Sequence, residues 1–134
     1  MKADTLTVFV PTRLVNPTNA REFWAVRMKR AKVQREAVAA MVWSAVSKPA
    51  GPWVLTSLWT PKCITFVAHV ARKMDSDGLQ ASLKACRDGL QRIVIDSDGP
   101  ESGHVFEYTQ LVAKPLGVQI TVTLLKPRGP ACPL

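Results

Sequence analysis

Residues 20–47 lie within the longest stretch of the sequence without glycine or proline, and they place the strongest limit on the fold. It reads AREFWAVRMKRAKVQREAVAAMVWSAVS, and an uninterrupted run of this length predicts one long helix. Residues 21–36 hold six basic side chains, whereas residues 37–46 are nearly all apolar. We therefore expect the apolar half to be buried and the basic half to project from the core.

The basic residues of this helix allow two interpretations. From residue 27 on they are spread around the helix axis, at about 100° per residue, rather than confined to one face. They are either the ordinary charges of a solvated helix end or a contact surface for the DNA backbone, and the sequence leaves both open. The candidate DNA-binding residues here are Arg27, Lys29, Arg30, Lys32 and Arg35.

Five other segments have the composition or the alternation of β-strands. They are residues 5–10, 53–59, 63–75, 104–112 and 118–125. In residues 63–75, Ile64, Phe66, Ala68 and Val70 point to one side of the strand. The turn AKPLG between the last two segments predicts a β-hairpin.

Residues 79–94 predict a second, amphipathic helix. Leu79, Leu83, Cys86, Leu90 and Ile93 recur at spacings of 4, 3, 4 and 3, which is one apolar stripe. The order β-α-β-β-α-β-β then predicts a single α+β domain over residues 1–125, with a mixed sheet packed by two main helices. Residues 126–134 are rich in proline, and we expect them to form a disordered tail.

Composition narrows the class of protein. No segment reaches the roughly 18 consecutive apolar residues of a membrane span, and the N-terminus lacks the pattern of a signal peptide, so we expect a cytoplasmic protein without a membrane partner. The three cysteines have no zinc-binding spacing. The net charge of +8 favours a polyanionic partner, of which nucleic acid is the commonest.

The tetrapeptide DSDG occurs twice, at residues 75–78 and 96–99, on either side of the second predicted helix. Neither copy is a calcium loop, because each lacks the third ligand position and the glutamate of an EF-hand. Both copies have the composition of turns. A metal site is the alternative, and the pattern alone leaves both interpretations open.

The metal interpretation depends on geometry. In a D-x-D at a strand end, Asp75 and Asp77 lie on the same side, and the return of the helix would place Asp96 or Asp98 beside them. Such carboxylates would need a cation, because two of them about 4 Å apart repel by roughly 4 kcal/mol at an effective dielectric near 20. An all-oxygen cluster favours Mg²⁺ or Mn²⁺. In a chain with a net positive charge, such an acidic metal site suits a phosphodiester substrate.

The stretch KMDSDGLQASLKACRDGL, followed by VIDSDGP and two strand segments, resembles the RusA family of Holliday-junction resolvases, and VPTRLVNPTNAREFWAVRMKRAKVQREAV is similar to the N-terminal part of the same family. The likeness covers roughly residues 5–125. It implies a homodimeric, Mg²⁺-dependent endonuclease that cuts four-way DNA junctions at symmetric positions in recombination, repair or phage DNA processing.

The resemblance also implies site residues. Asp75 and Asp77 match the two aspartates of the family's D-x-D motif, and the third family aspartate lies in the acidic turn. Because this turn reads Asp-Ser-Asp here, either Asp96 or Asp98 is the match, and the shorter reach from the helix end favours Asp96. The adjacent Arg72 is a further candidate for a DNA-backbone contact, as is Lys73.

Two positions depart from the family pattern. The asparagine that follows the D-x-D motif is replaced by Gly78, and a catalytic lysine of some members falls at Ala81. Lys84 lies three residues on and on the same helix face, where it would replace that lysine in contacting the phosphate. Asp88 is a candidate (i, i+4) partner for Lys84.

Two rival functions follow from these departures and from the weakness of a short motif. The first is a catalytically inactive protein that binds branched DNA. The second is a basic protein whose partner is another protein, with both DSDG stretches serving as turns.

Overall fold

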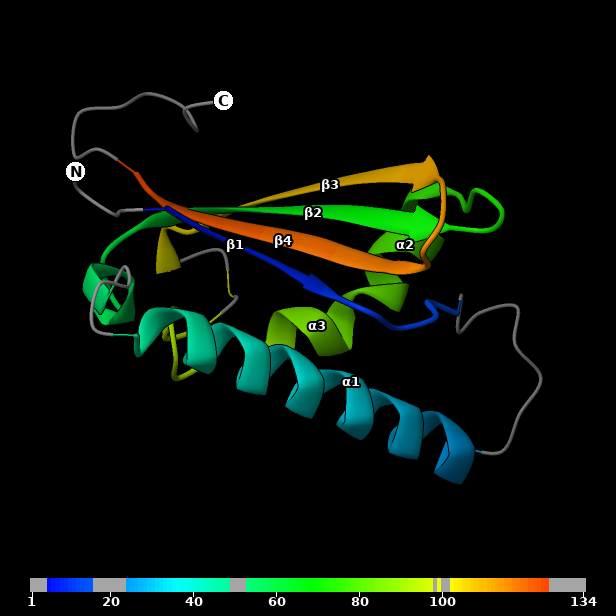
Figure 1. The fold of residues 1–134 in the computed structure, drawn as a ribbon, viewed down its shortest axis with the longest axis horizontal. Helices are drawn as coiled ribbons and strands as arrows, with labels where there is room; N and C mark the ends of the chain where they lie inside the picture. The colour runs from blue at the N-terminus through cyan, green and yellow to red at the C-terminus, as the bar shows by residue number, and fades with distance from the viewer. Residues whose placement is uncertain (1–4, 16–23, 49–52, 98, 100–101, 126–134) are drawn as a thin grey trace.

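The computed structural model describes residues 5–15, 24–48, 53–97, 99 and 102–125. They form one α+β domain in which the helices lie on one side of a four-stranded mixed sheet (Figure 1). The elements are β1 (Thr5–Val10), α1 (Trp24–Val46), the 3₁₀ helix η1 (Trp53–Thr56), β2 (Lys62–Val70), α2 (Ser76–Ser82), α3 (Lys84–Asp88), β3 (Val105–Val112) and β4 (Gly117–Leu124).

The strand order is β1-β4-β2-β3. Ile120 of β4 lies opposite Val8 of β1 and Phe66 of β2, antiparallel to both. β3 runs parallel to β2, with Tyr108 opposite Phe66. The predicted hairpin is therefore wrong, because β2 lies between β3 and β4. The turn signal fixed the reversal of direction after β3, but it could not fix which strand becomes the neighbour.

Two further segments differ from the predictions. Residues 53–59 contain η1 and turns instead of a strand, and Leu55 is buried there. Strand β2 ends at Val70 rather than at residue 75. The second predicted helix begins earlier, at Ser76, and is divided at Leu83 into α2 and α3.

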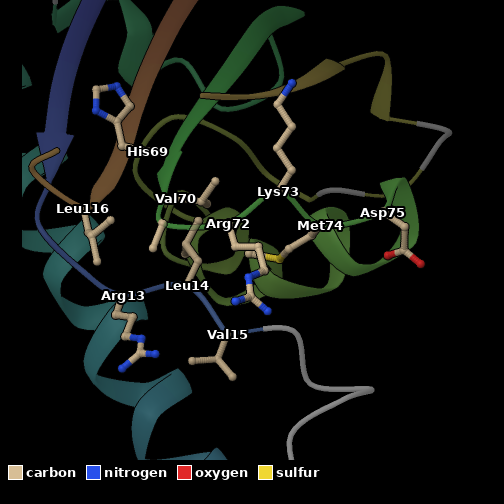
Figure 2. A pocket seen from close by; sticks show the side chains of 11 residues that line it. Arg13, Leu14, Val15, His69, Val70, Arg72, Lys73, Met74, Asp75 and Leu116 are labelled. Atoms are coloured by element: carbon tan, nitrogen blue, oxygen red, sulfur yellow. The ribbon is translucent and has the colours of Figure 1, made fainter. Parts of the chain in front are cut away.

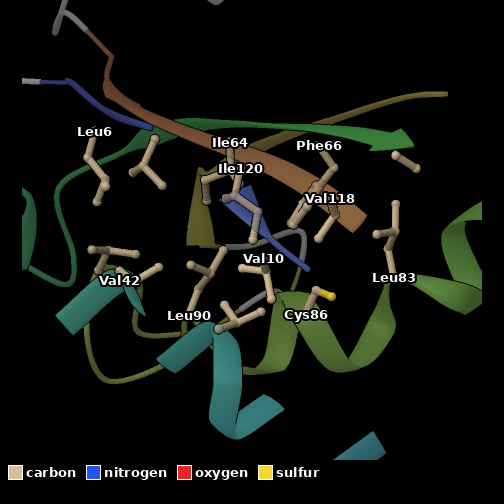
Figure 3. Packing of buried hydrophobic residues seen from close by; sticks show 14 of the residues in the cluster. Leu6, Val10, Val42, Ile64, Phe66, Leu83, Cys86, Leu90, Val118 and Ile120 are labelled. Atoms are coloured by element: carbon tan, nitrogen blue, oxygen red, sulfur yellow. The ribbon is translucent and has the colours of Figure 1, made fainter. Parts of the chain in front are cut away.

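The predicted apolar faces do form the core (Figure 3). The β2 side chains that were expected to share one face are all buried, and they pack toward the helices. The stripe of the second helix is buried from Leu79 to Leu90, and Ile93 is half-buried. Burial of these side chains, at about 25 cal/mol per Å² of apolar area, is the main force that holds the helices to the sheet.

Helix α1 buries only every fourth residue: Gln34, Val38, Val42 and Val46. The expectation that its apolar half is buried on all sides is wrong, because Trp43 is 57% exposed. α1 lies along the layer formed by the sheet and α3, so only one stripe faces the core (Figure 1). The residues from 24 to 29 are all exposed, as expected for the basic half.

Gly89, which follows α3, marks the closest approach to α1. A Cβ at this position would lie 2.6 Å from the backbone oxygen of Arg35 and 2.9 Å from Cβ of Val38. Only glycine fits this contact.

None of the described helices is both long enough and apolar enough to span a bilayer. The predicted tail at residues 126–134 lies outside the described residues, as does Asp98.

Candidate functional site

A hollow of about 510 Å³ lies at the end of the sheet where β2 finishes. Its lining includes Arg13, from the segment after β1, and Arg72, Lys73 and Asp75, from the turn after β2. Figure 2 shows the guanidinium groups of Arg13 and Arg72 pointing to the same side of the hollow, with Asp75 at its far rim and Lys73 pointing away. Two cations and one of the two motif carboxylates thus line the same hollow.

Asp75 is the N-cap of α2. Its Oδ1 accepts a hydrogen bond of 2.8 Å from the backbone nitrogen of Gly78, and its own backbone is extended. Asp77 lies in the first helical turn, where a negative charge is favoured by the free N–H groups. Both carboxylates are exposed. The first DSDG is therefore a helix start with two exposed acidic side chains, of which Asp75 lines the hollow.

Gln110 of β3 fixes the backbone just before Asp75. Its Oε1 accepts a hydrogen bond of 2.9 Å from the Met74 nitrogen, and its Nε2 donates one of 2.7 Å to the Met74 oxygen. One side chain thus satisfies both backbone groups of Met74. This double contact joins the turn to the neighbouring strand and positions Asp75.

Asp96 lies in a different environment. Its Oδ1 is 2.9 Å from Nε2 of His104, and Nδ1 of His104 accepts a hydrogen bond of 3.2 Å from the Lys62 nitrogen. Because Nδ1 is an acceptor, the ring proton is on Nε2, which donates a hydrogen bond to Asp96. This hydrogen bond, opposed by partial burial, lowers the pKa of Asp96 below its usual value. Asp96, the first residue of the second DSDG, is thus held to the residue just before β3.

The structure does not bring Asp96 to the end of the sheet where Asp75 lies. Asp96 contacts His104, just before β3, whereas the Asp75 turn contacts Gln110. Those two positions are six residues apart along the chain, or roughly 20 Å at about 3.3 Å per residue. The cause is the topology, because a helical connection between parallel strands returns the chain to the starting end of the sheet.

Within the described residues, no three side chains among histidine, cysteine, aspartate and glutamate lie close enough together to hold a metal ion. The oxygen donors Asp75, Asp77 and Asp96 have the right chemistry for Mg²⁺. A single chain nevertheless does not fit a magnesium site built from all three.

A second hollow, of about 210 Å³, lies between α1 and the α2–α3 pair. It is lined by Arg27, Arg30 and Arg35 of α1 and by Lys84 of α3, and it shares Val15 with the first hollow. The two hollows therefore adjoin, and we call their combined cationic lining the basic surface. It consists of Arg13, Arg27, Arg30, Arg35, Arg72, Lys73 and Lys84.

Lys84 forms the predicted (i, i+4) pair with Asp88, at 2.9 Å between Nζ and Oδ1. Because both side chains are partly exposed, this pair contributes little to stability. Lys29 and Lys32, the other candidate DNA contacts of α1, are exposed.

Sequence reasoning missed Arg13, Gln110 and the His104–Lys62 contact. Arg13 follows a strand by three residues and Gln110 lies within one, so neither belongs to a motif. Only the strand pairing brings them to the Asp75 turn. His69, which also lines the first hollow, packs edge-on against Phe9 with ring centroids 5.2 Å apart.

A scan against models of known protein families found no match, and a search of curated proteins found no significant one. The functional conclusion therefore rests on the residues of this chain.

Proposed function

We propose that the protein is a metal-dependent endonuclease that cuts branched DNA, with the four-way junction as its substrate. The observation that carries the proposal is the hollow at the end of β2, where Arg13 and Arg72 face the same side and Asp75 forms the rim. Cationic side chains beside exposed carboxylates are suited to a phosphodiester, since the cations hold the phosphates while the carboxylates hold a metal ion.

The basic surface extends the contact beyond one phosphate. It continues from the first hollow along α1, through Arg27, Arg30 and Arg35. Contacts of this kind fix the position of DNA without reading its sequence. Binding should therefore select the shape of the substrate and weaken steeply with salt.

The proposed cofactor is Mg²⁺, with Mn²⁺ as a substitute. Asp75 and Asp77 would supply oxygen ligands from one chain. The third carboxylate, Asp96 or Asp98, belongs to the second DSDG, and Asp96 would have to come from the other chain of a homodimer. Lys84, at the lip of the second hollow, is proposed to contact the phosphate.

A second candidate is an inactive protein that binds the same DNA. Asp75 caps a helix and Asp96 holds His104, so each carboxylate already has a structural role. Gly78 and Ala81 replace residues that the RusA resemblance associates with activity. These observations favour binding without cleavage.

The test is cleavage of a labelled synthetic four-way junction in Mg²⁺, beside a linear duplex. Asp77→Asn is the informative variant, because Asp77 is exposed and is not the cap residue. Glu36→Gln, at an exposed carboxylate that is not among the lining residues of either hollow, is the matched control. We expect paired symmetric nicks with the parent and with Glu36→Gln, and none with Asp77→Asn or on the duplex.

The other outcomes separate the rivals. Junction binding without nicks, in either Mg²⁺ or Mn²⁺, would establish the inactive DNA-binding protein. Absence of junction binding at low salt would reject both DNA functions in favour of a protein partner.

A further inference from the structure

The apolar stripe of α1 continues beyond the part of the helix that packs on the core. Its buried members recur at every fourth residue from Val46 back to Gln34. Further steps of three and four residues reach Ala31, Met28 and Trp24 on the same side of the helix. Met28 is 61% exposed and Trp24 is 73% exposed. Figure 1 shows this end of α1 extending past α3 and away from the sheet, so the stripe ends in two uncovered side chains, which we call the apolar pair.

Cationic side chains surround the apolar pair. Met28 lines the second hollow, and Trp24 lies one helical turn before it on the same face. The cations that line this hollow are Arg27, Arg30, Arg35 and Lys84. Among its described lining residues the one acid is Asp88, and the charge of Asp88 is paired with Lys84. An occupant must therefore offer apolar surface to the pair and negative charge to the arginines.

This requirement separates the candidate occupants. A second copy of the chain, docked on the pair across a two-fold axis, would bring two sets of arginines together, which is unfavourable. An uncharged apolar partner would take the arginines out of water without pairing them. Duplex DNA supplies the charge, but its bases are stacked on both faces and offer none to the pair. An unpaired strand supplies both, because each base has a free face and each link carries a phosphate.

We propose that Trp24 and Met28 bind the faces of unpaired bases in a single DNA strand, while the arginines of the second hollow hold its phosphates. The indole of Trp24 supplies a stacking surface that accepts every base. The thioether of Met28 makes favourable contacts with aromatic rings. The strand would then run along the N-terminal turns of α1, and its recognition would not depend on sequence.

The consequence for the substrate, and the choice of DNA over RNA, rest on the proposed function. The second hollow adjoins the first, which holds Asp75. A single strand on the apolar pair would therefore leave a branch point close to the candidate site. Branched DNA with one single-stranded arm should bind more tightly than the same branch with that arm made double-stranded.

The test compares labelled strands of equal length by fluorescence anisotropy at one salt concentration. The probes are oligothymidylate, an abasic strand that keeps the phosphates but lacks the bases, and a duplex. The parent should bind oligothymidylate more tightly than the abasic strand. Trp24→Ala should lose about tenfold in affinity for oligothymidylate, as expected for one stacked base, and should bind the abasic strand and the duplex like the parent.

Trp59→Ala is the matched control, because Trp59 is also 73% exposed and lies outside both hollows. It should bind every probe like the parent, and circular dichroism checks that both variants fold. Unchanged binding of oligothymidylate by Trp24→Ala, equal losses in the two variants, or an abasic strand bound as tightly as oligothymidylate would overturn the proposal. Tighter binding of oligouridylate than of oligothymidylate would overturn the choice of DNA.

The outcome is independent of cleavage. A protein that binds oligothymidylate through Trp24 but cuts no branched DNA would support this proposal and reject only the endonuclease. An active endonuclease in which Trp24→Ala leaves strand binding and the preference for a single-stranded arm unchanged would reject this proposal alone.

Discussion

Lys62 shows how a single residue connects the fold to the acidic turn. Its side chain is fully buried, and Nζ donates hydrogen bonds to the backbone oxygens of Ser57 and Thr60. Burial lowers the pKa of Lys62 from 10.5 to about 8, and the charge of Asp96 opposes this effect. Asp96 thus lies beside a lysine whose pKa is lowered, as well as beside His104.

The lowered pKa predicts how stability depends on pH. Between pH 8 and pH 10.5 the folded chain has released the Lys62 proton while the unfolded chain still binds it. Stability rises with pH when the unfolded state binds more protons. The free energy of unfolding should therefore increase across this window, relative to Lys62→Met, by about 3 kcal/mol at 1.36 kcal/mol per pKa unit.

Urea unfolding at a series of pH values measures this difference. Lys48→Met, at an exposed lysine, serves as the control and should follow the parent at every pH. A constant difference between the parent and Lys62→Met from pH 8 to pH 10.5 would show that Lys62 keeps its ordinary pKa in the fold.

At the scale of elements, local patterns predicted most of the segments, but not that residues 53–59 lack a strand and not which strands are neighbours. Residues 5–10 form a strand as expected, and the helical stripe that begins at Leu79 is buried. Which strands pair depends on where a helical connection returns to the sheet. The sequence does not show this, so it could not place β4 between β1 and β2. The same lack of long-range information hid the separation of Asp75 from Asp96, since a repeated motif carries no information about distance in space.

Pairing between elements also predicts a role for Gln110. Gln110→Leu removes both hydrogen bonds to Met74 and frees the turn that carries Asp75. If Asp75 acts in cleavage, nicking of the junction should slow by about tenfold to a hundredfold, because a displacement near 1 Å is costly to catalysis. Junction affinity should change little, since the arginines of α1 in the basic surface do not belong to this turn.

Gln119→Leu, the same substitution on β4, is the control and should change neither quantity. Junction affinity lost together with cleavage would mean that Gln110 supports the fold of the whole hollow rather than the position of Asp75.

At the scale of the whole molecule, the central fact is that one chain holds its acidic residues at two ends of a sheet. The basic surface adjoins the end of the sheet where Asp75 lies. The edge strand β3 runs from the end near Asp96 to the end near Asp75. The homodimer of the proposed endonuclease would bring the two ends together, because Asp96 of one chain would then lie beside Asp75 of the other.

Mixing two inactive variants tests this arrangement directly. Asn can still cap α2 in Asp75→Asn, and in Asp96→Asn its side-chain oxygen can still accept the His104 hydrogen bond, so both chains should fold. Each variant alone lacks one carboxylate in every site. In a mixed dimer, one site combines both substitutions and the other keeps both carboxylates, so the mixture should regain single-strand nicks on the junction. A mixture that exchanges chains yet stays as inactive as its components would mean that no site draws Asp75 and Asp96 from different chains.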